Sequence, residues 1–337
     1  MPLKVAFFST KPYDRKFFEC HNEKYGHDIT FLEPRLNRDT VKLAKDFPVV
    51  CAFVNDKLNA ENLQFLRDSG TRLIALRSTG FNNVDLETAD AQGLKVMRVP
   101  AYSPHAVAEH ALGLMLVVNR KIHRAYDRVR DQNFSLAGLL GFDMHGKTAG
   151  VIGTGKIGSI MCEILIGMGC RVLAYAHHER DRLKEKGVEF VSMDELLRSS
   201  DIITLHVPLT PETRNMIDRQ AVSKMKDGVM LINTCRGKVV DTEAVLDGLK
   251  KKKIGSFGMD VYEEEEDIFF RDLSEEIIPD DMLVQLIMMP NVVVTAHQGF
   301  FTSEAMDSIA DTTLKNITDF EEGRESENEV HSKKHTK

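Results

Sequence analysis

Short apolar runs alternate with longer polar segments along most of the chain. In the N-terminal part this pattern predicts strands at residues 4–8, 29–32, 49–54, 72–76 and 95–99. A second series begins at residue 148, with strands predicted at 149–152, 171–175, 202–205, 230–233, 256–259 and 292–295. Helix-like segments such as 60–69 and 86–92 fill the gaps, and strands that alternate with helices favour parallel sheets. We therefore predict an α/β protein, and its 337 residues are enough for about two domains.

A break in the pattern separates the two series and is followed by a long helix. Ser103 can cap that helix, and Pro104 suits its first position. The helix is predicted to continue to about Arg130. A last helix is predicted at 303–322, and the polar, charged tail after Gly323 is predicted to be disordered.

A glycine-rich turn lies between the first two strands of the second series. Residues 153–158 have the sequence Gly-Thr-Gly-Lys-Ile-Gly and directly follow the apolar run 148–152. In this GxGxxG pattern the first glycine makes a tight turn, the second lets the backbone approach a pyrophosphate, and the third lets the helix pack closely on its strand. The N-terminus of the following helix adds unpaired N–H groups and a positive dipole end. We therefore predict a dinucleotide site at this turn.

The composition argues against several classes of protein. The formal net charge of −7 does not suit a nucleic-acid-binding surface. The five cysteines are odd in number and include no CxxC pair, so we expect no disulfide framework, no metal site and a cytoplasmic location. No apolar run reaches the roughly 18 residues of a membrane span, and the N-terminus enters a strand without a signal peptide. A membrane partner is therefore not expected.

Three segments near the ends of late strands carry residues suited to chemistry. Arg236 directly follows an apolar strand, and its planar guanidinium can bind a carboxylate through two parallel hydrogen bonds. His297 ends the last strand, and an acidic run lies at 258–267. Taken singly, the arginine is more often a surface residue in a turn and the acidic run is usually a solvated face, while the histidine is as often structural as catalytic. Together they suit the reduction of a 2-keto acid, in which a carboxylate orients a histidine that protonates the ketone oxygen.

Several motifs resemble those of the D-2-hydroxyacid dehydrogenases, and the resemblance extends from about Lys4 to Glu322. Within that family the chain is most similar to enzymes that interconvert pyruvate and D-lactate. The matching segments are Phe81–Asp85, Val99–Tyr102, Ala106–His110, Gly150–Gly158, His206–Pro211, Asn233–Gly237, Gly258–Glu263 and His297–Phe300.

The resemblance implies a role for each catalytic candidate. Arg236 binds the substrate carboxylate, and His297 is the acid in reduction and the base in oxidation. The carboxylate partner of the histidine lies five residues after the aspartate of the Met-Asp-Val-Tyr motif, which selects Glu265. The resemblance also implies four substrate contacts, the backbone N–H groups of Thr79 and Gly80 and the side chains of Tyr102 and Phe300.

The family likeness also implies the cofactor contacts and the domain organisation. A flavodoxin-like substrate domain comprises residues 1–101 and 299–337, and a doubly wound nucleotide-binding domain comprises 102–298, so both domains are Rossmann-like. The active site lies between them, and the helix after Pro104 helps to form a homodimer or higher homo-oligomer. Residues implied to border the cofactor are Gly153, Gly155, Lys156, Ile157, Gly158, Ala176, His177, His178, His206, Val207, Pro208, Thr213, Thr234, Cys235 and Asp260, the last at the nicotinamide carboxamide.

One position departs from the family pattern. Members that prefer NAD usually carry an aspartate at the end of the second strand of the nucleotide domain, where it binds the ribose hydroxyls and repels a 2′-phosphate. Ala176 occupies this position here. Either Glu179 replaces the missing acid, or the missing charge together with His178 and Arg180 tolerates a 2′-phosphate. We predict NAD(H) as cofactor, with NADP(H) also accepted.

The predicted function is the reversible reduction of pyruvate to D-lactate, because Tyr102 and Phe300 imply a small pocket. A related enzyme acting on phenylpyruvate, hydroxypyruvate or glyoxylate is an alternative, since one methylene changes selectivity by only about 10 to 200-fold. A dinucleotide-sensing binding protein similar to corepressors is a more distant alternative, since such proteins can retain the same catalytic residues. The chain carries neither an extended Pro/Ser-rich tail nor a basic excess that would favour it.

Overall fold

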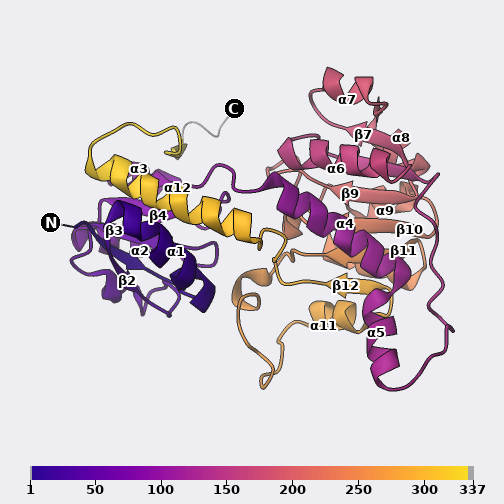
Figure 1. Cartoon of the computed structure of the whole chain (residues 1–337), viewed down its shortest axis with the longest axis horizontal. Helices are drawn as coiled ribbons and strands as arrows, with labels where there is room; N and C mark the ends of the chain where they lie inside the picture. The colour runs from indigo at the N-terminus through magenta and orange to yellow at the C-terminus, as the bar shows by residue number, and fades with distance from the viewer. Residues whose placement is uncertain (1, 333–337) are drawn as a thin grey trace. The chain divides into compact units, whose positions relative to one another are not determined.

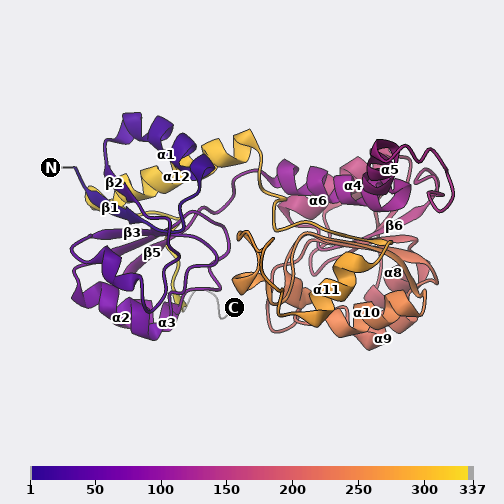
Figure 2. The same ribbon diagram turned by 90° about the horizontal axis from the view of Figure 1, so that it is seen from below.

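The computed structural model describes residues 2–332, and these form two compact units. The first unit contains the chain up to Ser103 and from Phe301 onward, and the second contains Pro104–Phe300. Each boundary lies two residues beyond the one expected from the sequence. The units are shown in Figures 1 and 2.

The first unit is built on a five-stranded parallel sheet with the order β2-β1-β3-β4-β5. Helices α1 (Pro12–Tyr25) and α12 (Ser303–Glu321) cover one face, and α2 (Ala60–Asp68) and α3 (Leu86–Ala91) cover the other (Figure 2). A short 3₁₀ helix, η1, spans Val41–Ala44. The strands are β1 (Lys4–Phe7), β2 (Asp28–Phe31), β3 (Val49–Ala52), β4 (Leu73–Leu76) and β5 (Lys95–Met97).

Local sequence explains these elements. Strands β3 and β4 are continuous apolar runs because helices cover both faces of a parallel sheet, and every residue in them is buried. Asn59 and Asp85 are the N-cap residues of α2 and α3, and each side chain accepts a hydrogen bond from a backbone N–H of the first turn. Gly26 ends α1 with φ of 75°, a conformation that glycine adopts without strain.

The second unit contains a seven-stranded parallel sheet with the order β12-β11-β10-β9-β6-β7-β8. Strands β6 to β8 are added toward one edge of the sheet, and β9 to β12 are added from β6 toward the other edge. This reversal of strand order makes the fold doubly wound, with its switch point at the carboxyl ends of β6 and β9. The strands are β6 (Thr148–Ile152), β7 (Arg171–Tyr175), β8 (Glu189–Phe190), β9 (Ile202–Leu205), β10 (Val229–Asn233), β11 (Ile254–Met259) and β12 (Val292–Val294). Our sequence analysis missed β8, a two-residue edge strand.

Helices cover both faces of this second sheet. Figure 2 shows α4 and α6 on one face and α8 to α11 on the other. The helices are α4 (Pro104–Arg120), α5 (Ile122–Arg130), α6 (Lys156–Gly167), α7 (Asp181–Glu185), α8 (Met193–Ser199), α9 (Arg219–Lys224), α10 (Thr242–Lys250) and α11 (Asp281–Met288), with 3₁₀ helices η2 (Gly237–Val239) and η3 (Glu265–Asp267). The prediction of two parallel-sheet α/β domains is confirmed.

The long helix predicted after Pro104 is in fact two helices, so that prediction was wrong. Helix α4 ends at Arg120, and Lys121 adopts a left-handed conformation with φ of 51°. A left-handed residue cannot continue a right-handed helix, so α5 starts anew at Ile122. The Lys121 ammonium donates a hydrogen bond to the Leu140 carbonyl at 2.7 Å. No glycine or proline marks this break, which is why the sequence pattern ran through it.

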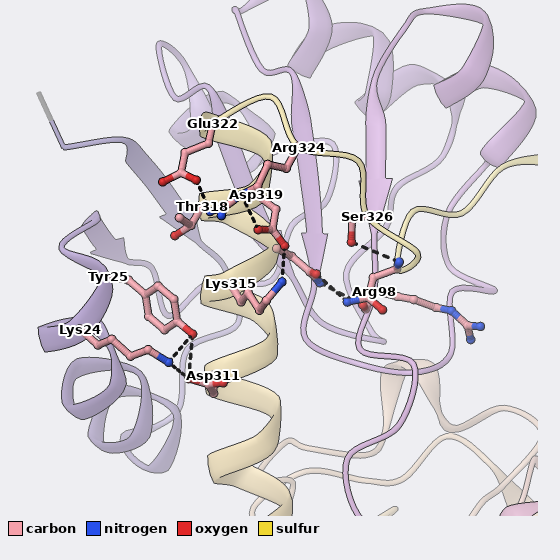
Figure 3. A network of polar contacts seen from close by, with 12 residues as sticks. Lys24, Tyr25, Arg98, Asp311, Lys315, Thr318, Asp319, Glu322, Arg324 and Ser326 are labelled. Atoms are coloured by element: carbon pink, nitrogen blue, oxygen red, sulfur yellow. Dashed lines mark hydrogen bonds and ion pairs between the residues drawn. The ribbon is translucent and has the colours of Figure 1, made fainter.

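The C-terminal tail is ordered up to residue 332, which also corrects our prediction. The segment pairs with the edge strand β5: the Val330 N–H donates to the Val96 carbonyl at 2.9 Å, and the Arg98 N–H donates to the Asn328 carbonyl at 3.0 Å. The Val330 side chain is only 4% exposed. The tail therefore gains order from backbone pairing and one buried side chain, which its polar composition conceals. Figure 3 shows this region beside α12. Residues 333–337 lie outside the described part.

No helix within residues 2–332 is both long enough and apolar enough to cross a lipid bilayer.

Candidate active site

The glycine-rich turn has the geometry that its sequence predicts. Gly153 follows β6 with φ of 92°, and a Cβ atom there would lie 2.5 Å from the His206 carbonyl oxygen. A Cβ atom on Gly158 would lie 1.8 Å from the Gly153 carbonyl oxygen. Both positions therefore require glycine, and Gly155 caps α6, whose first residues are Lys156 and Ile157. The turn leaves the helix N-terminus open to an anion.

His206 supports this turn from the end of β9. Its N–H donates to the Ile152 carbonyl at 2.8 Å, and its Nε2 lies 2.9 Å from Thr204 Oγ1. Burial lowers the pKa of His206 to about 4, so the ring is neutral at pH 7. Val207 also touches the turn, because a Cβ atom on Gly153 would lie 2.8 Å from its Cγ1. His206 and Val207 thus shape the turn through packing rather than through charge.

Further residues predicted to border the cofactor lie in the loops that follow β9 and β10. Thr213 donates from Oγ1 to the Pro208 carbonyl at 2.6 Å and accepts the Thr210 N–H at 2.8 Å, so its hydroxyl closes this loop. Thr234 Oγ1 is buried and has no hydrogen-bond partner among the described residues. Burial raises the pKa of the Cys235 thiol, which makes it a poor target for oxidation.

These features fit a dinucleotide. Gly153 and Gly158 allow the tight turn and the close helix packing, the space around Gly155 is open, and the unpaired Thr234 hydroxyl offers a polar atom at the same edge of the sheet. No group of three or more His, Cys, Asp or Glu side chains that could hold a metal ion occurs among residues 2–332.

Ala176 directly follows β7, so no carboxylate stands where NAD-preferring members carry an aspartate. Glu179 lies beyond exposed His177 and His178, and its carboxylate is 2.5 Å from the Lys184 ammonium. Arg180 Nε donates to the Thr154 carbonyl at 2.5 Å, which ties this cation to the glycine-rich turn. The loop that follows β7 therefore presents imidazoles and a guanidinium, while Glu179, the acid that could replace the missing aspartate, is paired with a lysine.

His297 and Glu265 form a direct pair. The imidazole Nδ1 lies 2.7 Å from Glu265 Oε1, and the two side chains are 20% and 21% exposed. The second carboxylate oxygen accepts the Tyr262 N–H at 2.8 Å, which fixes the orientation of Glu265. Since Nδ1 is engaged by the carboxylate, Nε2 is the ring nitrogen left to exchange a proton with a substrate.

The backbone of His297 is strained and held in place by Asp260. His297 has φ of 53°, which is costly for a residue other than glycine, and its N–H donates to the Asp260 carbonyl at 2.7 Å. The Asp260 carboxylate, only 2% exposed, accepts hydrogen bonds from the N–H groups of Gln298 and Gly299 at 2.9 and 2.8 Å. It also accepts one from Thr295 Oγ1 at 2.6 Å. Asp260 thus fixes the turn that carries His297.

His110 completes this polar cluster from α4. Its Nε2 lies 3.0 Å from Thr295 Oγ1 and 3.3 Å from Asp260 Oδ1. Burial alone would raise the pKa of Asp260, but the hydrogen bonds from His110 and Thr295 outweigh it and lower that pKa. Our sequence analysis did not select His110 or Thr295 as site residues, although His110 ends one of the matching motifs. The Asp260 carboxylate accepts hydrogen bonds from the protein itself, and its contact with the nicotinamide carboxamide stays a prediction.

Arg236 follows β10 at the same edge of the sheet as His297, which follows β12. Its Nη1 donates to the Cys235 carbonyl at 2.5 Å. The next residue, Gly237, packs so closely on the chain that a Cβ atom there would lie 2.0 Å from the Tyr262 carbonyl carbon. This contact joins the loop of Arg236 to the segment whose Tyr262 N–H binds Glu265.

The predicted substrate-binding residues are divided between the units. Thr79 and Gly80 follow β4 and Tyr102 follows β5 in the first unit, whereas Phe300 ends the second unit and is 9% exposed. The structure brings Glu265, His297 and Asp260 into contact, and places Arg236 on the same sheet edge. The convergence of residues from both units stays a prediction.

Comparison with known proteins identifies the family. Residues 112–299, more than half of the chain, match the NAD-binding domain of the D-isomer specific 2-hydroxyacid dehydrogenases. The chain belongs to this family. The dehydrogenase is 51% identical over 328 residues to a 2-hydroxyacid dehydrogenase homolog of Haemophilus influenzae. The alignment covers 97% of this chain and 99% of the relative. D-lactate dehydrogenase of Escherichia coli is 50% identical, with 97% and 100% covered.

Solved structures agree. The apo structure of D-lactate dehydrogenase from Escherichia coli is 48% identical and matches the dehydrogenase with a TM-score of 0.90 over 97% of this chain and 100% of that chain. D-lactate dehydrogenase from Aquifex aeolicus, solved with NAD and lactic acid, is 36% identical and has a TM-score of 0.84 over 95% of this chain and 96% of its own. The dehydrogenase is therefore an oxidoreductase with an NAD-binding domain.

Proposed function

We propose that this dehydrogenase reversibly reduces pyruvate to D-lactate. The observation that carries the proposal is the contact between His297 Nδ1 and Glu265 Oε1 at the ligand-binding edge of the nucleotide sheet. The family and the D-lactate dehydrogenases among its relatives support pyruvate as the substrate.

The reaction needs a hydride, which the bound nicotinamide supplies. His297 holds a proton on Nε2 and gives it to the ketone oxygen of pyruvate. Glu265 accepts the hydrogen bond from Nδ1, so it keeps the ring in place with Nε2 directed to the substrate. In lactate oxidation the neutral ring takes the hydroxyl proton back. Asp260 keeps the strained backbone of His297 in its working conformation.

Arg236 orients the substrate. Its planar guanidinium suits a carboxylate, which it can grip through two parallel hydrogen bonds. We further propose that the N–H groups of Thr79 and Gly80 bind the same carboxylate and that Tyr102 and Phe300 limit the pocket to a short side chain.

We also propose that the enzyme uses NADPH as well as NADH. Ala176 removes the charge that would repel a 2′-phosphate. Glu179 is the acid that could restore this charge, but it is paired with Lys184. Arg180, held at the Thr154 carbonyl, and His178 provide positive or neutral surroundings for a phosphate.

The test is a matrix of initial rates. NADH and NADPH are each combined with pyruvate, phenylpyruvate, hydroxypyruvate and glyoxylate. The proposal expects the highest kcat/KM with pyruvate, and rates with NADPH within about a hundredfold of those with NADH. A strong preference for another keto acid would show that pyruvate is the wrong assignment of the substrate. The absence of any turnover would favour a dinucleotide-binding function.

A second copy of this chain is the partner that we propose for α5 and the loop after it. Apolar side chains there are at least half exposed: Ile122, Tyr126, Val129, Phe134, Leu136 and Leu140. A surface of this kind marks an interaction site. Light scattering after gel filtration should give a homodimer or a higher homo-oligomer. All five cysteines are free, which supports a reducing compartment, and we propose the cytoplasm.

A further inference from the structure

The loop that follows β4 is held from one side by an arginine that no step of the reaction uses. Arg98 Nη1 donates a hydrogen bond to the Thr79 carbonyl oxygen at 3.0 Å. We propose that Arg98 is a positioning residue, which orients the Gly80 N–H toward the substrate carboxylate. This inference rests on the proposed function, in which the Gly80 N–H binds the substrate carboxylate.

The physical link is the peptide bond between Thr79 and Gly80. This unit is planar and trans, so its C=O and N–H groups point in opposite directions. A donor that fixes the Thr79 carbonyl therefore also fixes the direction of the Gly80 N–H, on the side away from Arg98. A cationic donor on the carbonyl also polarises the unit, which makes the opposite N–H a better donor to an anion.

The same loop is closed by a second contact. Ser78 Oγ donates to the Gly80 carbonyl at 2.8 Å, and the Val99 N–H donates to the Ser78 carbonyl at 3.1 Å. The Gly80 residue is thus fixed on both sides, by Arg98 through the preceding peptide and by Ser78 through its own carbonyl. Preorganised donors of this kind bind an anion without reorganisation when it arrives.

Arg98 is itself held by the C-terminal part of the chain. Its backbone N–H donates to the Asn328 carbonyl at 3.0 Å, and its carbonyl accepts the Asn316 amide of α12 at 3.0 Å. The two asparagines are joined, since Asn328 Nδ2 donates to Asn316 Oδ1 at 2.8 Å. Figure 3 shows Arg98 between α12 and the tail near Ser326.

The guanidinium has one further neighbour. Its carbon lies 5.2 Å from the centroid of the Phe81 ring, so the cation is stacked on the far end of the loop that it bonds. Arg98 thus contacts the loop at Thr79 and at Phe81, while its backbone is bound by Asn316 and Asn328. The tail after α12 is, in this arrangement, part of the support of the substrate loop.

The experiment compares Arg98→Met and Arg98→Lys with Arg72→Met in the purified full-length enzyme. Arg72 is an exposed arginine of the same unit, stacked on Phe320, and serves as the matched control. We expect Arg98→Met to raise KM for pyruvate about tenfold, the equivalent of about 1.4 kcal/mol. The change in kcat should be smaller, and NADH binding measured by its fluorescence should not change. Arg98→Lys should give an intermediate KM, since an ammonium keeps the charge without the planar fork.

An unchanged KM for pyruvate in Arg98→Met, in an enzyme that binds NADH normally, would overturn the inference. If Arg98→Met lowered kcat, NADH affinity and melting temperature together with the rise in KM, the inference would also be overturned, because such general losses indicate only a structural role. If Arg98→Met does not fold, Arg98→Lys decides: a KM for pyruvate equal to that of Arg72→Met contradicts the inference, and a selective rise supports it. Failure of the unmodified enzyme to reduce pyruvate would instead refute the proposed function.

Discussion

His297 Nδ1 lies 2.7 Å from Glu265 Oε1, and the other oxygen of that carboxylate accepts the Tyr262 N–H. The pair is one fifth exposed, so the carboxylate acts on the ring with limited screening by water. This contact is the basis for assigning the proton transfer to His297, because it fixes the ring orientation and leaves Nε2 to exchange the proton.

Substitution of Glu265 should therefore slow proton transfer. In Glu265→Gln the imidazole loses the carboxylate that accepts its Nδ1–H and orients the ring, so kcat should fall about tenfold or more in both directions. Steady-state kinetics of pyruvate reduction and of lactate oxidation measure this. Glu264→Gln, one residue away in the chain, is the matched control. An unchanged kcat in Glu265→Gln would refute the role of Glu265.

His206 should make the stability of the fold depend on pH. Its pKa is lowered by burial from 6.5 to about 4, so below pH 6.5 the unfolded chain takes up a proton that the folded chain does not. The stability is full above pH 6.5 and falls as the pH approaches 4, by about 2 kcal/mol between pH 7 and pH 5. Urea unfolding of His206→Asn should show a smaller loss over this range than wild type, whereas exposed His178→Asn should show the same loss as wild type. Equal losses in all three proteins would contradict the prediction.

Restoring the acid after β7 should separate the two cofactors. Ala176→Asp places a negative charge where a 2′-phosphate would bind, so kcat/KM for NADPH should fall about a hundredfold or more while that for NADH stays similar or improves. Steady-state kinetics with both cofactors measure the ratio. If kcat/KM of the unmodified enzyme were thousands of times lower with NADPH than with NADH, the proposal that the enzyme uses both cofactors would be wrong.

The sequence pattern was sufficient for most of the fold. Strands such as β7 and β9 are apolar runs with clear ends, and two of the turn glycines, Gly153 and Gly158, are required because a Cβ atom there would strike neighbouring backbone atoms. The pattern failed where tertiary contacts decide. Nothing local marks Lys121 as left-handed, and the polar tail is ordered by backbone bonds to β5 and by one buried valine.

The site shows the same division. His297 and Arg236 could be selected because each follows a strand at the ligand-binding edge of a parallel sheet. Glu265 could not be selected from its acidic neighbours by pattern alone, since only the folded 3₁₀ turn brings it to the imidazole. His110 and Thr295 lie far apart in the chain and come together beside Asp260 only in the folded structure, so no local signal joins them.

The most direct test of the account is the stereochemistry and the histidine dependence of pyruvate reduction. Purified enzyme is supplied with pyruvate and NADH, and the lactate formed is assayed for chirality. The account predicts D-lactate, with kcat about 10²–10⁴-fold lower in His297→Ala although NADH still binds. L-lactate as the product, or an undiminished kcat in His297→Ala, would contradict it.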